Sequence, residues 1–118
     1  MWTSAMASVL LVEDEPLIRM MVADMLVELG HSVAGEASDL ATGLMLASAS
    51  GIEAAILDVK LGEDSSEIIA EALQSRRIPF VFASGYGADG IPAAFKDHPV
   101  LRKPFPIEEL ESLAALLS

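Results

Sequence analysis

The sequence contains no cysteine, so it can form neither a disulfide framework nor a thiolate metal site. Only 7 Lys and Arg residues stand against 18 Asp and Glu, which gives a formal net charge of -11. Nucleic acids and anionic membrane surfaces bind clustered basic side chains, so we expect neither as a direct partner. No uncharged apolar run reaches the roughly 18 residues of a membrane span, and residues 1–8 do not resemble a signal peptide. We therefore expect a cytoplasmic protein.

Aromatic residues are also scarce, at 5% of the chain, although 53% of the residues are hydrophobic. The core must therefore be built from Ala, Leu, Val, Ile and Met, which is typical of parallel sheets covered by helices. A length of 118 residues is enough for one domain with a sizeable core. We predict an N-terminal extension over residues 1–7 and one domain over residues 8–118.

Short apolar runs alternate along the chain with segments of helical periodicity. The predicted strands are residues 8–12, 31–37, a central run within 54–62 that delivers Asp58, 80–84 and 100–102. The predicted helices are residues 16–29, about 39–49, about 66–77 and 107–117, with a short, weak helix at 92–96. Five such alternations predict the α/β class, with a doubly wound five-stranded parallel sheet and helices on both faces.

Polar side chains stand at the ends of four predicted strands: Glu13 and Asp14, Asp58, Ser84 and Lys103. Parallel strands share a direction, so these side chains can meet at one edge of the sheet, where open α/β sheets bind ligands. Three neighbouring carboxylates would repel one another unless a divalent cation neutralised them. Oxygen ligands without His or Cys favour Mg²⁺ or Mn²⁺.

These groups suit phosphoryl transfer, in which catalysis consists mainly of positioning and of neutralising charge on the phosphoryl oxygens. Asp58 is the candidate nucleophile and phosphoacceptor. We expect the metal to hold one phosphoryl oxygen and the Lys103 ammonium a second. The Ser84 hydroxyl, with nearby backbone N–H groups, would hold a third.

In this order on these elements, the acidic pair, Asp58, Ser84 and the run 103–105 resemble a response-regulator receiver domain of bacterial two-component signalling. The resemblance covers essentially the whole chain. It implies a flavodoxin-like fold and a histidine kinase or histidine phosphotransfer protein as partner. It also implies Mg²⁺ ligation by Asp14, Asp58 and the Lys60 backbone carbonyl, with Glu13 acting through water, and a cis peptide bond between Lys103 and Pro104.

The sequence departs from the usual receiver pattern in its switch. Most receivers carry Tyr or Phe three residues before the Lys of the fifth strand, where this chain has Val100. Residues 82–87 instead resemble the Phe-Ala-Thr-Gly-Tyr motif of single-domain alphaproteobacterial regulators. We therefore predict that the switch lies after the fourth strand and uses Ser84 and Tyr86.

The leading hypothesis is a stand-alone receiver that catalyses phosphorylation and dephosphorylation of its own Asp58 and is not a turnover enzyme. It could serve as a phosphate shuttle, a phosphate sink or a protein-binding regulator, or be a receiver cut from a hybrid kinase. One alternative is a small Mg²⁺-dependent phosphatase, although Lys60 stands where such enzymes need a second acid. Another is a pseudo-receiver that binds proteins without phosphorylation. We expect His31 and His98 at the surface, without a role.

Overall fold

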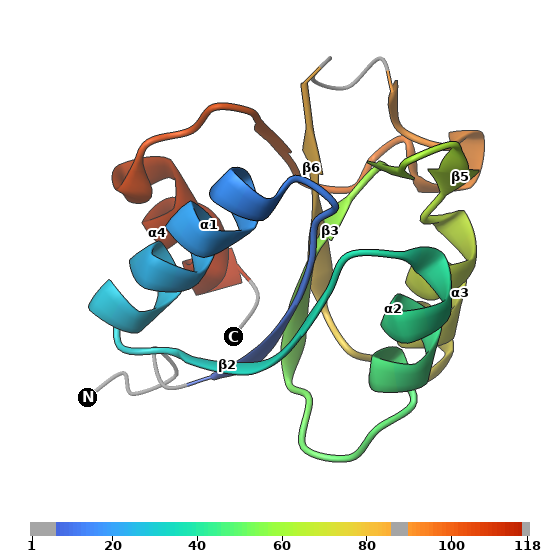
Figure 1. Cartoon of the computed structure of the whole chain (residues 1–118), viewed down its shortest axis with the longest axis horizontal. Coiled ribbons are helices and arrows are strands. Elements are labelled where there is room, and N and C mark those ends of the chain that lie inside the picture. Colours follow the sequence, from blue (N-terminus) through green and yellow to red (C-terminus); the bar gives the residue numbers. More distant parts are fainter. Residues whose placement is uncertain (1–6, 86–89, 117–118) are drawn as a thin grey trace.

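The computed structural model describes residues 7–85 and 90–116 and contains a five-stranded parallel sheet (Figure 1). The strands lie in the order β2-β1-β3-β6-β7. Their bounds are β1 Ser8–Val12, β2 Ser32–Ala37, β3 Ala54–Asp58, β6 Phe80–Ser84 and β7 Val100–Arg102. All four neighbouring pairs are parallel, as the sequence pattern predicts.

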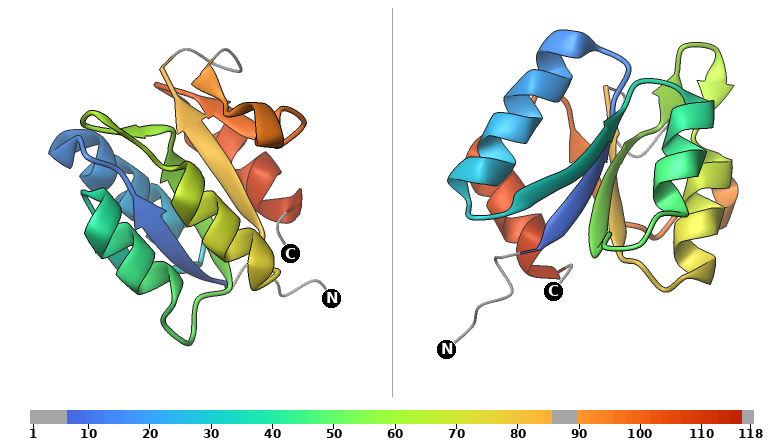
Figure 2. Two further views of the ribbon diagram at one scale, coloured as in Figure 1. Left: turned by 90° about the vertical axis from the view of Figure 1, so that its right-hand side faces the viewer. Right: turned by 60° about the horizontal axis from the view of Figure 1, so that its bottom comes forward.

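Helices cover both faces of the sheet, which confirms the predicted fold class (Figures 1 and 2). The helices α1 (Pro16–Glu28) and α4 (Ile107–Leu116) cover one face. The helices α2 (Leu40–Ala47) and α3 (Glu67–Ser75) cover the other. None of the helices in the described residues has the length and apolar character that crossing a membrane requires.

Strand β1 shows how one strand serves two cores. Leu10 and Val12 belong to the cluster under α2 and α3, whereas Val9 and Leu11 belong to the cluster under α1 and α4. This division follows from the two-residue period of a strand, which points successive side chains to opposite faces. Since both faces are covered, the strand is apolar throughout.

Local signals set the ends of the helices next to the sheet. Pro16 occupies the first position of α1, where its missing N–H is not needed. Gly30 follows the same helix with a φ of 94°, a conformation that glycine adopts without strain. The Asp39 carboxylate accepts a hydrogen bond of 2.8 Å from Thr42 N and so caps α2.

The segment after β3 forms a structure that the sequence pattern does not predict. The strand ends at Asp58, and a small antiparallel hairpin follows, formed by β4 (Lys60–Leu61) and β5 (Asp64–Ser65). Gly62, with a φ of 64°, stands in its turn. The hairpin is too short to produce a recognisable alternation in the sequence.

Between Gly90 and β7 the described residues form no α-helix, and the short 3-10 turn η2 (Ala93–Phe95) lies there. It packs through Phe95 onto Phe80 and Phe82 of β6. His98 stacks on the Phe80 ring with centroids 4.2 Å apart, so it is half-buried rather than a plain surface residue. The surface prediction is wrong for His31 too, because this side chain is buried and its Nδ1 accepts a hydrogen bond from Ala7 N.

Three further expectations concern individual positions. The peptide bond between Lys103 and Pro104 is cis, as expected. Tyr86, the predicted switch ring, lies outside the described residues. Strand β1 begins at Ser8, and the extension over residues 1–7 stays a prediction because residues 1–6 are not described.

Candidate functional site

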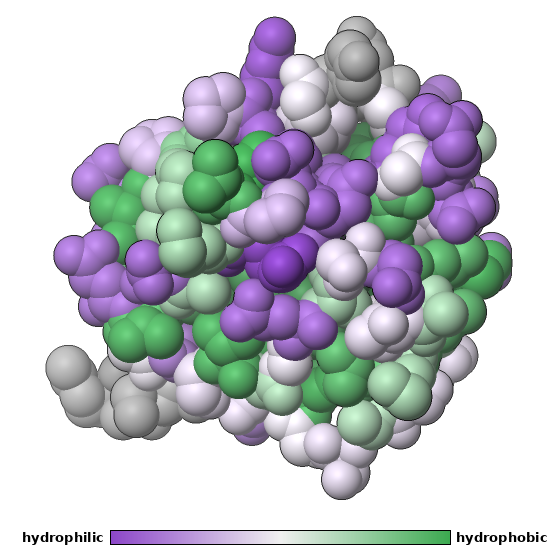
Figure 3. All heavy atoms as spheres, viewed as in Figure 1, coloured by the Kyte–Doolittle hydropathy of each residue, from purple (hydrophilic) through white to green (hydrophobic). Residues whose placement is uncertain are grey.

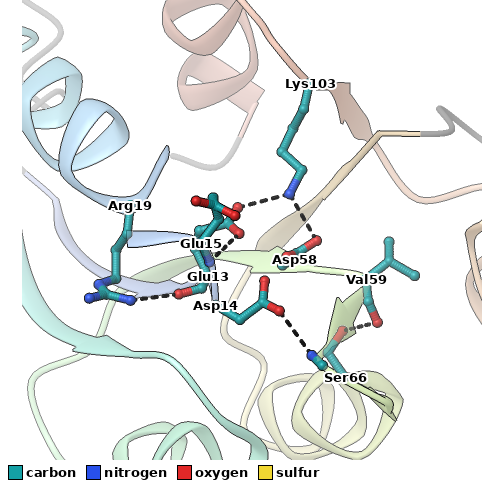
Figure 4. A network of polar contacts seen from close by, with 9 residues as sticks. Glu13, Asp14, Glu15, Arg19, Asp58, Val59, Ser66 and Lys103 are labelled. Carbon is teal, nitrogen blue, oxygen red and sulfur yellow. Dashed lines mark hydrogen bonds and ion pairs between the residues drawn. The ribbon is translucent and has the colours of Figure 1, made fainter. Parts of the chain in front are cut away.

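The strand register brings the predicted groups to one level at the carboxyl edge of the sheet. Val12 pairs with Leu57, so the next residues along each strand, Glu13 and Asp58, lie side by side. In the same way Ser84 pairs with Arg102, which places Lys103 next to the end of β6. Figure 4 shows the side chains of Glu13, Asp58 and Lys103 converging from the ends of β1, β3 and β7.

The Lys103 ammonium lies between two carboxylates. Its Nζ is 3.0 Å from Glu13 Oε1 and 3.2 Å from Asp58 Oδ1 (Figure 4). The side chains of Glu13 and Asp58 are only 3% and 9% exposed, so both ion pairs are largely shielded from water. Such pairs are screened much less by salt than surface pairs are. The ammonium therefore holds the two strand ends together electrostatically.

Asp14 is exposed and reaches toward the hairpin that follows β3. Its Oδ2 accepts a hydrogen bond of 2.9 Å from Gly62 N. Beside it, Glu13 Oε2 accepts a hydrogen bond of 3.1 Å from Glu15 N, which keeps the Glu13 carboxylate turned back onto its own loop. The acidic loop after β1 and the hairpin after β3 are thus connected across the mouth of the site.

Ser66 fixes the chain directly after the candidate phosphoacceptor. It is fully buried, and both its hydroxyl and its backbone N–H donate to the Val59 carbonyl, at 3.1 Å and 3.0 Å. Val59 N in turn donates to Ala83 O. The sequence predicted Ser66 only as a possible helix start, and its hydroxyl does not cap α3. No spacing in the sequence signals this bond, because it depends on how the loop folds back.

Ser84, the candidate phosphoryl ligand, is buried at the end of β6. Its carbonyl accepts a hydrogen bond of 2.8 Å from Lys103 N. A Cβ atom built at Gly90 would stand 3.2 Å from the Ser84 hydroxyl oxygen and 3.8 Å from Val59. Gly90 therefore lies close to the Ser84 hydroxyl.

The electrostatics of the site are dominated by burial and by the crowding of acids. Burial raises the pKa of Asp58 to about 8, with Glu13 adding to the rise and the Lys103 charge opposing it. Burial alone would lower the pKa of Lys103, but Glu13 and Asp58 raise it above its usual value. Burial would raise the pKa of Asp14 too, yet hydrogen bonds, first that from Gly62, lower it. Asp58 therefore needs a further positive charge beside it to ionise at neutral pH.

The three acids are placed so that they can share a metal ion. One oxygen from each of Glu13, Asp14 and Asp58 lies within 4.8 Å of the others. A cation at this point would oppose both the burial and the repulsion from Glu13 that raise the pKa of Asp58. The donor set consists of oxygen atoms, which fits a hard divalent ion. The Lys60 carbonyl ligand stays a prediction, and Lys60 stands exposed at the start of β4.

Comparison with known proteins adds relatives of the same fold. No family model matches the sequence. SdrG from Sphingomonas melonis Fr1 is 47% identical, and its solution structure matches with a TM-score of 0.86 over 98% of this chain and 100% of SdrG. The transcriptional regulatory protein PdtaR of Mycobacterium tuberculosis is 34% identical in a 106-residue alignment that covers 86% of this chain and 52% of PdtaR. This chain therefore spans about half the length of PdtaR.

Two structures of lower identity share the fold. The response-regulator REC domain of PhyR from Erythrobacter litoralis is 24% identical with a TM-score of 0.81, over 96% of this chain and 92% of that domain. The receiver domain of the sensor histidine kinase PA1611 from Pseudomonas aeruginosa is 21% identical with a TM-score of 0.77, over 95% of this chain and 97% of that domain. That structure holds a magnesium ion in its active-site cleft. With SdrG matched over its whole length, this chain belongs to the response-regulator receiver family.

A first prediction concerns pH in the absence of metal. A carboxyl whose pKa rises from 3.8 to about 8 on folding stabilises the protein while it is protonated, and this contribution is lost as pH rises through that window. In EDTA, Asp58→Asn should therefore unfold with a free energy similar to that of the wild type near pH 4. Near pH 8 the variant should be more stable by about 1–3 kcal/mol.

Urea unfolding across this pH range measures the difference. Asp24→Asn removes the same charge from an exposed position on α1 and serves as the control. If Asp58→Asn and Asp24→Asn follow the same pH profile, the charge conflict at Asp58 is not present in the folded protein.

Proposed function

We propose that this receiver accepts a phosphoryl group on Asp58 and changes its binding to other proteins while phosphorylated. The observation that carries the proposal is the placement of the Asp58 carboxylate. It lies at the carboxyl edge of the sheet, 3.2 Å from the Lys103 ammonium and within a group of three acids that can hold a metal. The donor would be a phosphohistidine on a sensor kinase or phosphotransfer protein.

The transfer itself needs few residues. An Asp58 oxygen forms a bond to phosphorus as the phosphorus–nitrogen bond of phosphohistidine breaks, and the electron pair of that bond stays on the imidazole nitrogen. Lys103 lies where it can pair with a phosphoryl oxygen, and the Ser84 hydroxyl and nearby backbone N–H groups are candidates for another. Later attack by water would release inorganic phosphate and restore the carboxylate, so the protein acts only on itself.

The acids suit Mg²⁺ or Mn²⁺, with Asp14, Asp58 and the Lys60 carbonyl as direct ligands and Glu13 acting through water. When bound, the ion supplies positive charge that favours the ionised Asp58 and neutralises a phosphoryl oxygen. Asp58 must be ionised to attack phosphorus, and its pKa of about 8 leaves much of it protonated at neutral pH without such a charge. We therefore expect phosphorylation to depend on a divalent cation.

The phosphatase alternative has less support. A second acid two residues after the nucleophile would be needed to protonate a leaving alcohol, and Lys60 stands there with an exposed side chain. A histidine leaving group requires less assistance, which agrees with the receiver reaction. A pseudo-receiver would not need the ion pair between Asp58 and Lys103, so this ion pair favours the receiver over that alternative.

The experiment that tests the proposal is intact-protein mass spectrometry after incubation with acetyl phosphate and Mg²⁺. We expect the wild type to gain one phosphoryl group with Mg²⁺ and none in EDTA. The Asp58→Asn variant should gain none under either condition. Asp24→Asn, changed at an exposed position on α1, should be labelled like the wild type. An unchanged mass in the folded wild type would favour the pseudo-receiver reading, and labelling of Asp58→Asn would place the acceptor elsewhere.

A docking surface for the phosphodonor must adjoin the site, and helix α1 offers one. An apolar groove of about 290 Å³ lies between α1, which contributes Ile18, Met21 and Met25, and the segment Lys103, Pro104 and Phe105. Leu17, Met20 and Met21 of α1 are 66%, 57% and 49% exposed. Figure 3 shows apolar side chains, in green, gathered over this part of the molecule. The groove touches Lys103, so we propose that the apolar face of the helix bearing the phosphohistidine packs here.

The prediction is that Met21→Glu slows phosphoryl transfer from an autophosphorylated histidine kinase about tenfold or more, because it puts a charge into the apolar contact. Labelling by acetyl phosphate needs no protein contact and should stay unchanged. Met45→Glu on α2, at a position 65% exposed, is the matched control and should leave both reactions unchanged. Equal transfer rates for the two variants would exclude α1 as the docking surface.

A further inference from the structure

Arg19 of α1 contacts the backbone of the acidic loop that follows β1. Its Nη1 donates to the Glu13 carbonyl oxygen at 2.9 Å (Figure 4), and its Nε lies 3.3 Å from Glu36 Oε1 on β2. We propose that Arg19 is a positioning residue that holds the Glu13–Asp14 peptide in the orientation required for metal binding. The inference rests on the metal-dependent function proposed above.

The contact is important because it fixes the Glu13 carbonyl oxygen. The Glu13 carbonyl belongs to the peptide bond that leads into Asp14, so its orientation sets the direction in which the Asp14 side chain leaves the backbone. On the other side of Glu13, the backbone N–H donates to Ala37 O of β2 at 2.9 Å. The sheet thus fixes the amide that precedes Glu13, and Arg19 fixes the one that follows it.

Asp14 needs this support more than the other two acids do. Glu13 and Asp58 are buried and paired with Lys103, whereas Asp14 is exposed and accepts a hydrogen bond from Gly62 in the turn of a two-residue hairpin. Metal ligands must be held to within about half an ångström of their working positions. A rigid backbone before Asp14 can provide that precision where the side chain itself is exposed to solvent.

Glu36 serves the same arrangement. Its side chain is 45% exposed, and an ion pair so open to water contributes little to stability. It can, however, hold the guanidinium in the geometry that reaches the Glu13 carbonyl, because an arginine can donate in two directions at once. It also neutralises the Arg19 charge, so the arginine can support the loop without repelling a cation strongly.

The test is the affinity of the full chain for Mg²⁺, measured by isothermal titration calorimetry. The double variant Arg19→Gln/Glu36→Gln removes both contacts and leaves the net charge unchanged. We expect its Kd for Mg²⁺ to rise about tenfold, as for other residues that orient metal ligands. Acetyl phosphate labelling should fall at low Mg²⁺ and recover at saturating Mg²⁺, because Asp58 and Lys103 remain in place.

Arg76→Gln provides the control. The Arg76 guanidinium also donates to backbone carbonyls, those of Ala47 and Ala49, where α2 ends and the chain turns toward the start of β3. Its loss should lower the melting temperature and leave the Kd for Mg²⁺ within about twofold. Arg19→Lys keeps the charge and the fold but cannot make both contacts, so its Kd should lie between those of the wild type and the double variant.

The outcomes separate the two proposals. A double variant that binds Mg²⁺ as the wild type does would overturn the positioning role and leave the proposed function intact. A loss of affinity in Arg76→Gln equal to that in the double variant would also overturn it, since general destabilisation would then explain both. If the folded wild type binds no Mg²⁺, the metal-dependent function fails, and the role of Arg19 fails with it.

Discussion

The site depends on one ammonium group placed between two shielded carboxylates. Lys103 lies 3.0 Å from Glu13 and 3.2 Å from Asp58, and it connects the ends of β1, β3 and β7 at one edge of the sheet. One positive charge cannot balance three acids, and burial, with Glu13 adding to it, still raises the pKa of Asp58 to about 8. The folded protein therefore gathers more acidic groups than Lys103 can balance, at the point where a divalent cation would supply the missing positive charge.

The parallel sheet explains why these groups meet. The strands β1, β3 and β6 are almost entirely buried, so their functional polar residues stand where the strands end, and the register sets those ends at one level. The loops then refine the arrangement: Ser66 fixes the chain after Asp58, and Arg19 fixes the chain before Asp14. The sheet brings the acids together, and the loops orient them.

Much of this could be predicted from the sequence because the signals are local. Apolar runs that end in Asp58 or Lys103 predict both the sheet and the edge, and the motif order identifies the receiver family. The hairpin after β3 and the contacts of Arg19 and Ser66 could not be predicted, since they depend on loop backbone conformation that leaves no periodic pattern. The surface prediction fails for His31 and His98 for a related reason, because ring packing and a hydrogen bond to Nδ1 are tertiary features.

The central claim is that the acidic edge carries a charge conflict that a divalent cation resolves. The most direct measurement is the free energy of unfolding near pH 8 in EDTA and in several millimolar Mg²⁺, for the wild type and for Asp58→Asn. Since a ligand stabilises the state that binds it, we predict that Mg²⁺ raises the wild-type value and raises the Asp58→Asn value much less. Equal values with and without Mg²⁺ in the wild type, or equal stabilisation of both proteins, would contradict the account.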